Sequence, residues 1–170
     1  MYKFTCPDKC CEIDIHPSNN LKKSIYKKNK RKAGVFTYDP VENKVLLVQS
    51  RGNLWGPPKG TIKYGETERE CAIRELEEET GIQIGRDCFT KAYNIHYKSY
   101  YYYLEKDICD VCFDECLDDN DVNAVGWIKP ECLQKCINNG QIVLSRHCKI
   151  LFKQFLNKQI HDSNFKQVRY

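Results

Sequence analysis

Apolar and β-branched runs alternate with polar segments along the chain and predict two pairs of strands around one central helix. Residues 33–38 and 44–50 flank the polar sequence DPVEN, a pattern typical of paired strands joined by a turn. Residues 89–97 and 99–107 indicate the second strand pair, in which a run of tyrosines must alternate between the two faces. Residues 125–128 indicate a last short strand.

Three helices are marked by capping residues. Thr67, followed three residues later by Glu70, has the spacing of a capping box, and Gly81 stands where a left-handed residue would end that helix. Residues 130–138 predict a helix opened by proline, and Ser145 is expected to cap a final amphipathic helix. This order of elements predicts an α/β/α sandwich around a mixed β-sheet.

The two ends of the chain are less regular in pattern than its middle. Residues 1–20 contain two prolines and a polar SNN segment, and we expect them to be irregular. Our predicted domain organisation is therefore a basic N-terminal lead-in over residues 1–31, one domain over 32–157 and a C-terminal tail over 158–170.

Length and hydropathy are those of a single soluble domain. The chain has 170 residues and a formal net charge of +4. It carries neither the apolar core of a signal peptide near its start nor a run of about 18 apolar residues anywhere. We therefore expect a cytoplasmic protein with no membrane partner.

A block of seven basic residues without an acid occupies residues 22–32. Such a block either remains solvated, here as a strand edge or an arm, or meets a polyanion. The second interpretation makes Lys27, Lys28, Lys30 and Arg31 candidate substrate-binding residues, because their charge would attract a phosphate-rich molecule.

Eleven cysteines are many for a chain of this length, and their odd number argues against a disulfide framework. Residues 6, 10 and 11 form one cluster and residues 109, 112 and 116 another. One interpretation is that the clusters contribute to a zinc site, separately or together. Only one C-x2-C pair is present, without a convincingly spaced partner. The sequence therefore favours reduced thiols over a structural zinc site.

Three glutamates share one face of the central helix. At about 100° per residue, Glu78 and Glu79 lie to either side of Glu75, and like charges at this spacing repel. A divalent cation with oxygen ligands would relieve that repulsion. An ordinary solvated acidic face is the alternative that the carboxylates alone leave open.

The spacing of the whole segment points to one family. The segment from Gly60 to Ile82 resembles the Nudix box, G-x5-E-x7-R-E-U-x-E-E-x-G-U with U aliphatic, at every defined position. The resemblance implies a Nudix-type sandwich and a pyrophosphohydrolase that uses Mg²⁺, or Mn²⁺, to direct water at a phosphorus atom next to a nucleoside.

The resemblance also implies roles for individual residues. It assigns the metal to the carboxylates of Glu75, Glu78 and Glu79, with the carbonyl of Lys59 or Gly60 as a further ligand. It implies that Arg74 holds a glutamate in place and that Glu66 supports the helix start or reaches the metal shell. The general base would be Glu75 or an acidic residue of a later loop; the loop candidates are Glu115, then Asp118, Asp119 and Asp121.

The substrate is indicated by the segment WGPPKG that precedes the box. It is similar to WGFPKG of messenger-RNA decapping enzymes, and its PPKG part is similar to asymmetric dinucleoside tetraphosphate hydrolases. It departs from the first pattern at Pro57 and from the second at Gly56. Lys59 is placed to meet a phosphate, and Trp55 is expected either to stack on a base or to fill the core.

Several substrates remain open at this point. Cleavage of the RNA 5' cap is our first expectation, because a long RNA requires a positively charged track. Dinucleoside polyphosphates and diphosphoinositol polyphosphates are alternatives. A non-catalytic nucleotide- or RNA-binding module is the alternative of another class, although such a module would usually have lost box carboxylates, and none is lost here.

Overall fold

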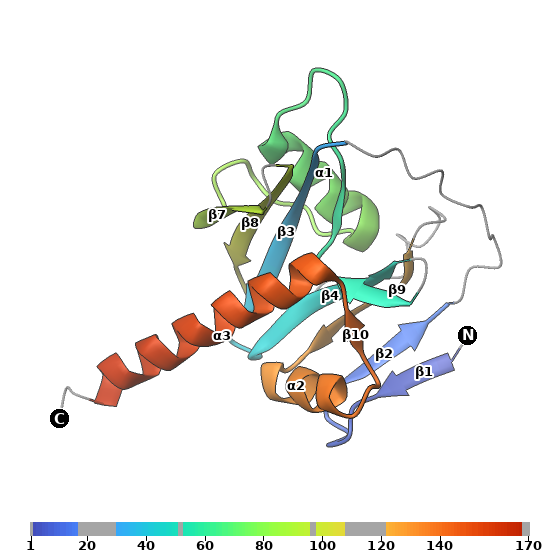
Figure 1. The fold of residues 1–170 in the computed structure, drawn as a ribbon, viewed down its shortest axis with the longest axis vertical. Coiled ribbons are helices and arrows are strands. Elements are labelled where there is room, and N and C mark those ends of the chain that lie inside the picture. The colour runs from blue at the N-terminus through green and yellow to red at the C-terminus, as the bar shows by residue number, and fades with distance from the viewer. Residues whose placement is uncertain (1, 17–29, 51–52, 96–97, 108–121, 168–170) are drawn as a thin grey trace.

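A mixed β-sheet with helices on both faces forms the fold, as the computed structural model shows (Figure 1). The structure describes residues 2–16, 30–50, 53–95, 98–107 and 122–167. This arrangement confirms the α/β/α sandwich expected from the order of the elements.

Seven strands form the main path of the sheet. In spatial order they are β1 (Tyr2–Thr5), β2 (Glu12–Ile15), β9 (Val122–Ile128), β4 (Lys44–Ser50), β3 (Lys32–Asp39), β8 (Ser99–Glu105) and β7 (Lys91–Ile95). Along this path β3 and β8 run parallel and the other neighbours run antiparallel, so the sheet is mixed. Three short strands join it from the side, namely β5 (Leu54–Gly56), β6 (Lys59–Thr61) and β10 (Val143–Leu144).

The hairpin of β3 and β4 confirms the strand pair predicted around DPVEN. The side chain of Asp39 accepts hydrogen bonds from the backbone N–H groups of Val41 and Glu42, at 2.9 and 3.1 Å. Asn43 completes the turn in the left-handed region, at φ 51°. The turn residues and the apolar pattern of the two strands therefore both predict the hairpin that is observed.

Helix α1 (Glu68–Thr80) begins and ends where its caps predict. Thr67 and Glu70 form both halves of the capping box, and Gly81 ends the helix at φ 72°. The helix buries Ala72 and Leu76 in a cluster with apolar residues of β3 and β4, which places α1 on one face of the sheet.

Helices α2 (Pro130–Asn138) and α3 (Arg146–Gln167) cover the other face. The Ser145 hydroxyl accepts a hydrogen bond from the backbone N–H of Cys148 at 3.4 Å, which supports its expected role as the cap of α3. Helix α3 continues to Gln167, into the segment 158–170 that was predicted as a C-terminal tail, and its far end projects beyond the sheet (Figure 1). No helix in the described ranges is long and apolar enough to cross a bilayer.

The tyrosine run in β8 alternates as expected for a strand with both faces covered. Tyr101 and Tyr103 are buried on the side of α3, whereas Tyr100 and Tyr102 are half-buried on the side of α1. Each tyrosine pair therefore belongs to a different layer of the sandwich.

The expectation of an irregular start is wrong, because residues 2–15 form the hairpin of β1 and β2. Ile13 and Ile15 are buried, and Ile15 pairs with Ala124 of β9. The alternation in EIDI has the period of a strand, but four residues beside prolines and charges are too few to reveal it. Gly126 of β9 permits the packing, since a Cβ there would lie 2.5 Å from Cγ1 of Ile13.

We expect Gly126→Ala to lower the free energy of unfolding by about 1–3 kcal/mol, because the added methyl overpacks against Ile13. In the Ile13→Ala background the same change should cost less, since the clashing side chain is gone. Urea denaturation measures both effects. Gly85→Ala is the matched control, because a Cβ there meets only Cys88 Sγ at 3.8 Å. Equal costs of Gly126→Ala in both backgrounds would contradict the packing of the hairpin.

Candidate active site

Arg74 of α1 is the centre of the acidic cluster. Its Nε and Nη2 atoms donate to the two carboxylate oxygens of Glu66, at 2.7 and 3.0 Å. Its Nη1 donates to Glu75 Oε1 and to Glu78 Oε2, both at 2.7 Å. One guanidinium therefore contacts three glutamates, and the role of Arg74 in holding a box carboxylate in place stays a prediction.

Local geometry explains these contacts. Glu78 lies four residues after Arg74 on the same helix face, and Glu66 lies in the turn that precedes the helix. The backbone N–H of Lys63 also donates to Glu66, at 2.9 Å. The hydrogen bonds from Arg74, and secondly the one from this amide, lower the pKa of Glu66 from its ordinary 4.5 to about 2. The Glu66 carboxylate in turn raises the pKa of Arg74. In this structure Glu66 braces the arginine.

The carboxylate of Glu75 is pressed against the backbone of β6. A Cβ at Gly60 would overlap that carboxylate, so only glycine permits this approach. Burial raises the pKa of Glu75, and its hydrogen bond with Arg74 acts in the opposite direction. A half-buried carboxylate with a raised pKa is a suitable general base at neutral pH.

Glu79 is held on the other side of the helix face by the same strand. The backbone N–H of Lys59 donates to Glu79 Oε2 at 2.9 Å. Strand β6 is itself fixed by antiparallel pairing with β3, in which Gly34 faces Lys59 and Lys32 faces Thr61. Gly60 and Thr61, the first residues of the segment GTIKYG that opens the box, thus lie in this short strand, and the backbone of the strand contacts the glutamates.

A divalent cation fits the chemistry of this donor set. Glu75, Glu78 and Glu79 offer hard oxygen ligands, as Mg²⁺ and Mn²⁺ prefer, and Gly60 leaves room for the carboxylate beside the backbone carbonyls at Lys59 and Gly60. When bound there, such an ion neutralises phosphate oxygens and lowers the pKa of water. Arg74 contacts two of these carboxylates in the structure, so it also sets their orientation.

Lys32 and Lys63, which were not among the candidate site residues, lie at the border of the acidic cluster. Burial, together with the nearby Lys59 ammonium, lowers the pKa of Lys32, while Glu75 and Glu79 oppose that shift. The Nζ atom of Lys63 lies 3.6 Å from Glu78 Oε1. The register between β3 and β6 brings Lys32 here, and sequence spacing alone carries no such signal.

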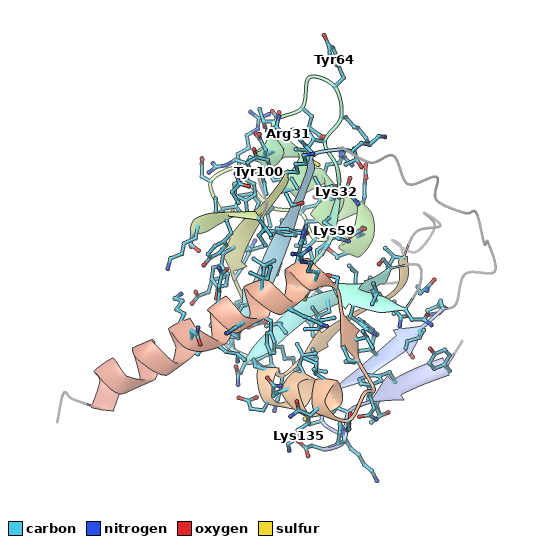
Figure 2. The ribbon with its side chains drawn as sticks, in the orientation of Figure 1. Arg31, Lys32, Lys59, Tyr64, Tyr100 and Lys135 are labelled. Carbon is cyan, nitrogen blue, oxygen red and sulfur yellow. The ribbon has the colours of Figure 1, made fainter. Side chains whose placement is uncertain are left out.

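Lys30 and Arg31 are exposed at the start of β3. Arg31 forms an ion pair with Glu68 and lies over the ring of Tyr100, 5.1 Å from its centroid. Figure 2 shows Arg31, Lys32 and Lys59 on the same side of the molecule as α1. Basic side chains of the described part of the basic block therefore lie beside the acidic cluster.

Several candidate residues lie outside the described ranges. They are Lys27 and Lys28 of the basic block, and Glu115, Asp118, Asp119 and Asp121 of the acidic segment. Their roles stay predictions from the sequence.

The structure does not support base stacking on Trp55. The side chain is only 2% exposed, and its ring lies 6.4 Å from that of Phe4 between centroids. Strand β5 pairs with both β4 and β10, which directs the indole into the core. Of the two interpretations of Trp55, the core residue is the one observed. Tyr64, in the loop between β6 and α1, is instead fully exposed (Figure 2).

The sandwich and the braced glutamate cluster define a hydrolase of phosphoric anhydride bonds with an acidic site. The model of the NUDIX domain matches residues 28–147. The chain therefore belongs to the Nudix family and is a Nudix hydrolase.

Several known proteins are similar to this chain in sequence or in fold. Protein 111R of Invertebrate iridescent virus 3 is 33% identical over 152 residues, covering 84% of this chain and 88% of that protein. The m7GpppN-mRNA hydrolase dcap-2 of Caenorhabditis elegans is 44% identical over 63 residues, 35% of this chain but only 8% of that protein. The solved Ap4A hydrolase of C. elegans matches with a TM-score of 0.52 and 23% identity, covering 77% of this chain and 99% of that one, which supports the fold alone.

Gly60→Ala should lower kcat/KM about 100-fold, because the methyl displaces the Glu75 carboxylate from β6. Steady-state hydrolysis of any phosphoanhydride that the protein cleaves with Mg²⁺ measures the effect. Gly85→Ala, the same chemical change in an open position, should leave the rate unchanged. Full activity of Gly60→Ala would show that the position of Glu75 does not matter.

Glu66→Gln should lower the free energy of unfolding at pH 7 by about 1.5–3 kcal/mol, since a charge-assisted contact with Arg74 is lost. The folded pKa of Glu66 is depressed, so this contribution is fully present above pH 4.5 and is lost as the pH falls toward about 2.

Urea denaturation between pH 7 and pH 3 tests this dependence. The difference between the wild type and Glu66→Gln should be constant down to about pH 5 and then shrink. Glu42→Gln removes an exposed ion pair with Lys44 and should change stability little at any pH. A difference for Glu66→Gln that does not depend on pH would contradict the role of the ionised pair.

Proposed function

We propose that this Nudix hydrolase cleaves the 5' cap of RNA and releases a methylated guanosine diphosphate. The observation that carries the proposal is the group of basic residues beside the box glutamates: Lys59 and Lys32, with Arg31 and Lys30 directly before Lys32 in the chain. A single-stranded RNA carries one charge per nucleotide and gains from such a track. The local similarity to dcap-2 supports the same substrate.

The chain's own residues account for the reaction as follows. Glu75 is our first choice of general base: it accepts a proton from water as the oxygen attacks phosphorus, and the bond to the departing phosphate oxygen breaks. Arg74 keeps the carboxylate oriented, and Lys59 and Lys32 lie where they offset phosphate charge. Glu115 is the alternative base. The site requires Mg²⁺, with Mn²⁺ as a substitute, for the charge neutralisation described above.

A dinucleoside polyphosphate is the second candidate substrate. It is supported by the PPKG segment, in which Pro57 and Pro58 are buried and the carbonyl of Pro58 accepts a hydrogen bond from Val35 N–H at 3.0 Å. Such a small substrate does not need basic residues beyond the site. A diphosphoinositol polyphosphate is a third candidate, on charge alone. The intact box carboxylates speak against a module that only binds.

A substrate panel tests the proposal. Capped RNA, a free cap dinucleotide, dinucleoside polyphosphates, diphosphoinositol phosphates and oxidised nucleoside triphosphates are each incubated with the protein and Mg²⁺ or Mn²⁺. We expect the highest kcat/KM on capped RNA, with Glu79→Gln inactive on every substrate. Faster cleavage of a dinucleoside polyphosphate than of capped RNA would overturn the choice of substrate.

Lys30→Ala/Arg31→Ala should weaken cleavage of capped RNA several-fold and reduce the salt dependence of KM, whose slope should fall by about 1.4 for two lost phosphate contacts. Cleavage of a dinucleoside polyphosphate should be unaffected. Lys91→Ala/Lys153→Ala removes two exposed cations on β7 and α3, away from β6, and is the charge-matched control. Equal losses on both substrates, or none, would contradict an RNA track.

A further inference from the structure

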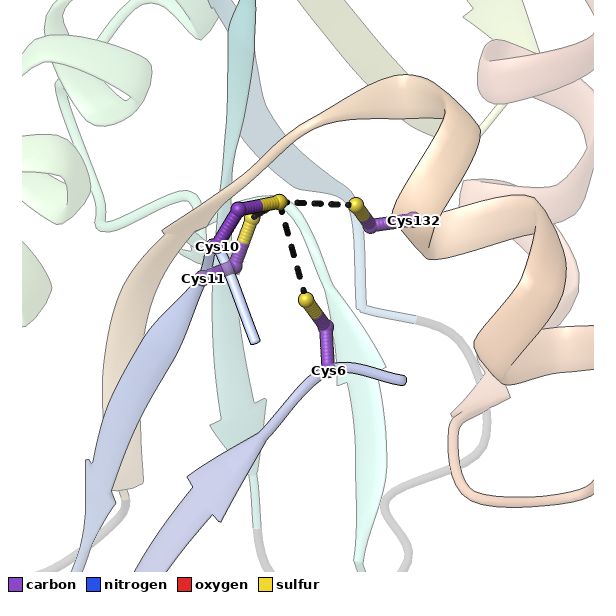
Figure 3. A group of neighbouring side chains, drawn as sticks. All are labelled: Cys6, Cys10, Cys11 and Cys132. Atoms are coloured by element: carbon purple, nitrogen blue, oxygen red, sulfur yellow. Dashed lines mark hydrogen bonds between the residues drawn. The ribbon is translucent and has the colours of Figure 1, made fainter. Parts of the chain in front are cut away.

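Four cysteines that lie far apart in the sequence meet at one point of the structure. Cys6, Cys10 and Cys11 come from the turn between β1 and β2, and Cys132 comes from the first turn of α2 (Figure 3). All four sulfur atoms lie within 4.8 Å of one another, and among the described residues this is the one group with such an arrangement of metal-binding side chains. We propose that they bind a structural Zn²⁺ ion.

The sulfur separations match a tetrahedral thiolate site. With Zn–S bonds of about 2.3 Å, the edges of a regular tetrahedron of sulfurs are about 3.8 Å long. Cys10 Sγ lies 3.8 Å from Cys6 Sγ, 3.7 Å from Cys11 Sγ and 3.3 Å from Cys132 Sγ. Cys6 and Cys10 also have C-x3-C spacing, within the range typical of zinc sites.

The hairpin turn is built in a way that presents its cysteines together. The backbone N–H of Cys6 donates to the carbonyl of Cys11 at 3.0 Å, and that of Lys9 donates to the carbonyl of Cys6 at 2.9 Å. Lys9 takes the left-handed conformation, with φ 55°, which a residue other than glycine adopts rarely. Backbone geometry therefore holds Cys6 and Cys11 side by side with Cys10 between them in sequence.

The surroundings suit a charged zinc–thiolate centre. Cys6, Cys11 and Cys132 are buried, and Cys10 closes the group from the exposed side. The backbone N–H of Lys129 points to Cys11 Sγ at 3.4 Å. The Lys135 ammonium lies 2.6 Å from Asp8 Oδ2, which in turn lies 3.8 Å from Cys132 Sγ. A backbone donor and a lysine ion pair thus border a site that would carry net negative charge.

The proposed ion has a structural role. Four protein ligands leave no open position for water or substrate, as in closed zinc sites. The ion would link the β1–β2 hairpin to α2, two elements whose buried residues belong to the same hydrophobic cluster. Soft thiolates also distinguish this centre from the carboxylates of α1, so the two sites would take different metals. The proposal replaces the expectation from the sequence that zinc is not bound, and it does not depend on the substrate.

Zinc analysis of the whole 170-residue chain, purified without a metal-affinity tag and dialysed in reducing buffer, tests the proposal. We expect about one equivalent of Zn²⁺ per chain, and Co²⁺ in its place should give the absorption of a tetrahedral thiolate complex. Cys10→Ser and Cys132→Ser should each lower the zinc content about tenfold. Cys10→His should restore binding, because histidine is also a zinc ligand.

Cys136→Ser is the matched control, since Cys136 is a buried cysteine one turn along α2 but not one of the four. It should retain zinc. Wild-type protein that binds less than about a tenth of an equivalent after reconstitution, or that carries disulfides among these cysteines, would overturn the proposal. So would full zinc content in Cys10→Ser and Cys132→Ser.

Discussion

The active site depends on one constraint: the repulsion of several carboxylates gathered on a single helix and its entry turn. The positive charge of Arg74 offsets that repulsion, because its guanidinium forms ion pairs with Glu66, Glu75 and Glu78 at the same time. Because the guanidinium is planar and rigid, it also fixes the relative directions of these side chains. A lysine would supply the charge but not the geometry. Arg74 links the turn before the helix to the helix itself, and the ion pair between Lys63 and Glu78 adds a second connection.

The sheet contributes to the site through close backbone contacts. Gly34 of β3 lies so near Pro58 and Lys59 that a side chain at this position would overlap them, and Gly60 relates in the same way to Glu75. Gly34 therefore lets β3 approach the Pro58–Lys59 backbone closely, and Gly60 lets the Glu75 carboxylate of α1 lie against β6. The two prolines between β5 and β6 are buried and stiffen this approach. The positions of the glutamates thus follow from backbone packing as much as from helical spacing.

The limits of α1 and part of the acidic cluster could be predicted from the sequence, because they depend on local spacing. Thr67, Glu70 and Gly81 act locally, so the limits of α1 followed from their spacing. The contact of Arg74 with Glu78 is likewise a local, four-residue relation.

The positions of other site residues depend on strand pairing between distant parts of the chain, which sequence spacing does not reveal. Lys32 reaches the glutamates through strand register, and Trp55 enters the core because β5 lies between two strands. Three of the four clustered cysteines are neighbours in the sequence of the turn. The fourth, Cys132, is more than a hundred residues away in the chain, a separation that no spacing rule covers.

The pairing of Ile15 with Ala124 has a consequence for how the chain assembles. During synthesis the β1–β2 hairpin leaves the ribosome long before its partner β9 is made. Until then Ile13 and Ile15, which are buried in the folded protein, remain exposed to water. Closing a loop of roughly a hundred residues also carries an entropic cost that local elements such as α1 avoid. The edge of the sheet that is made first is therefore completed among the last.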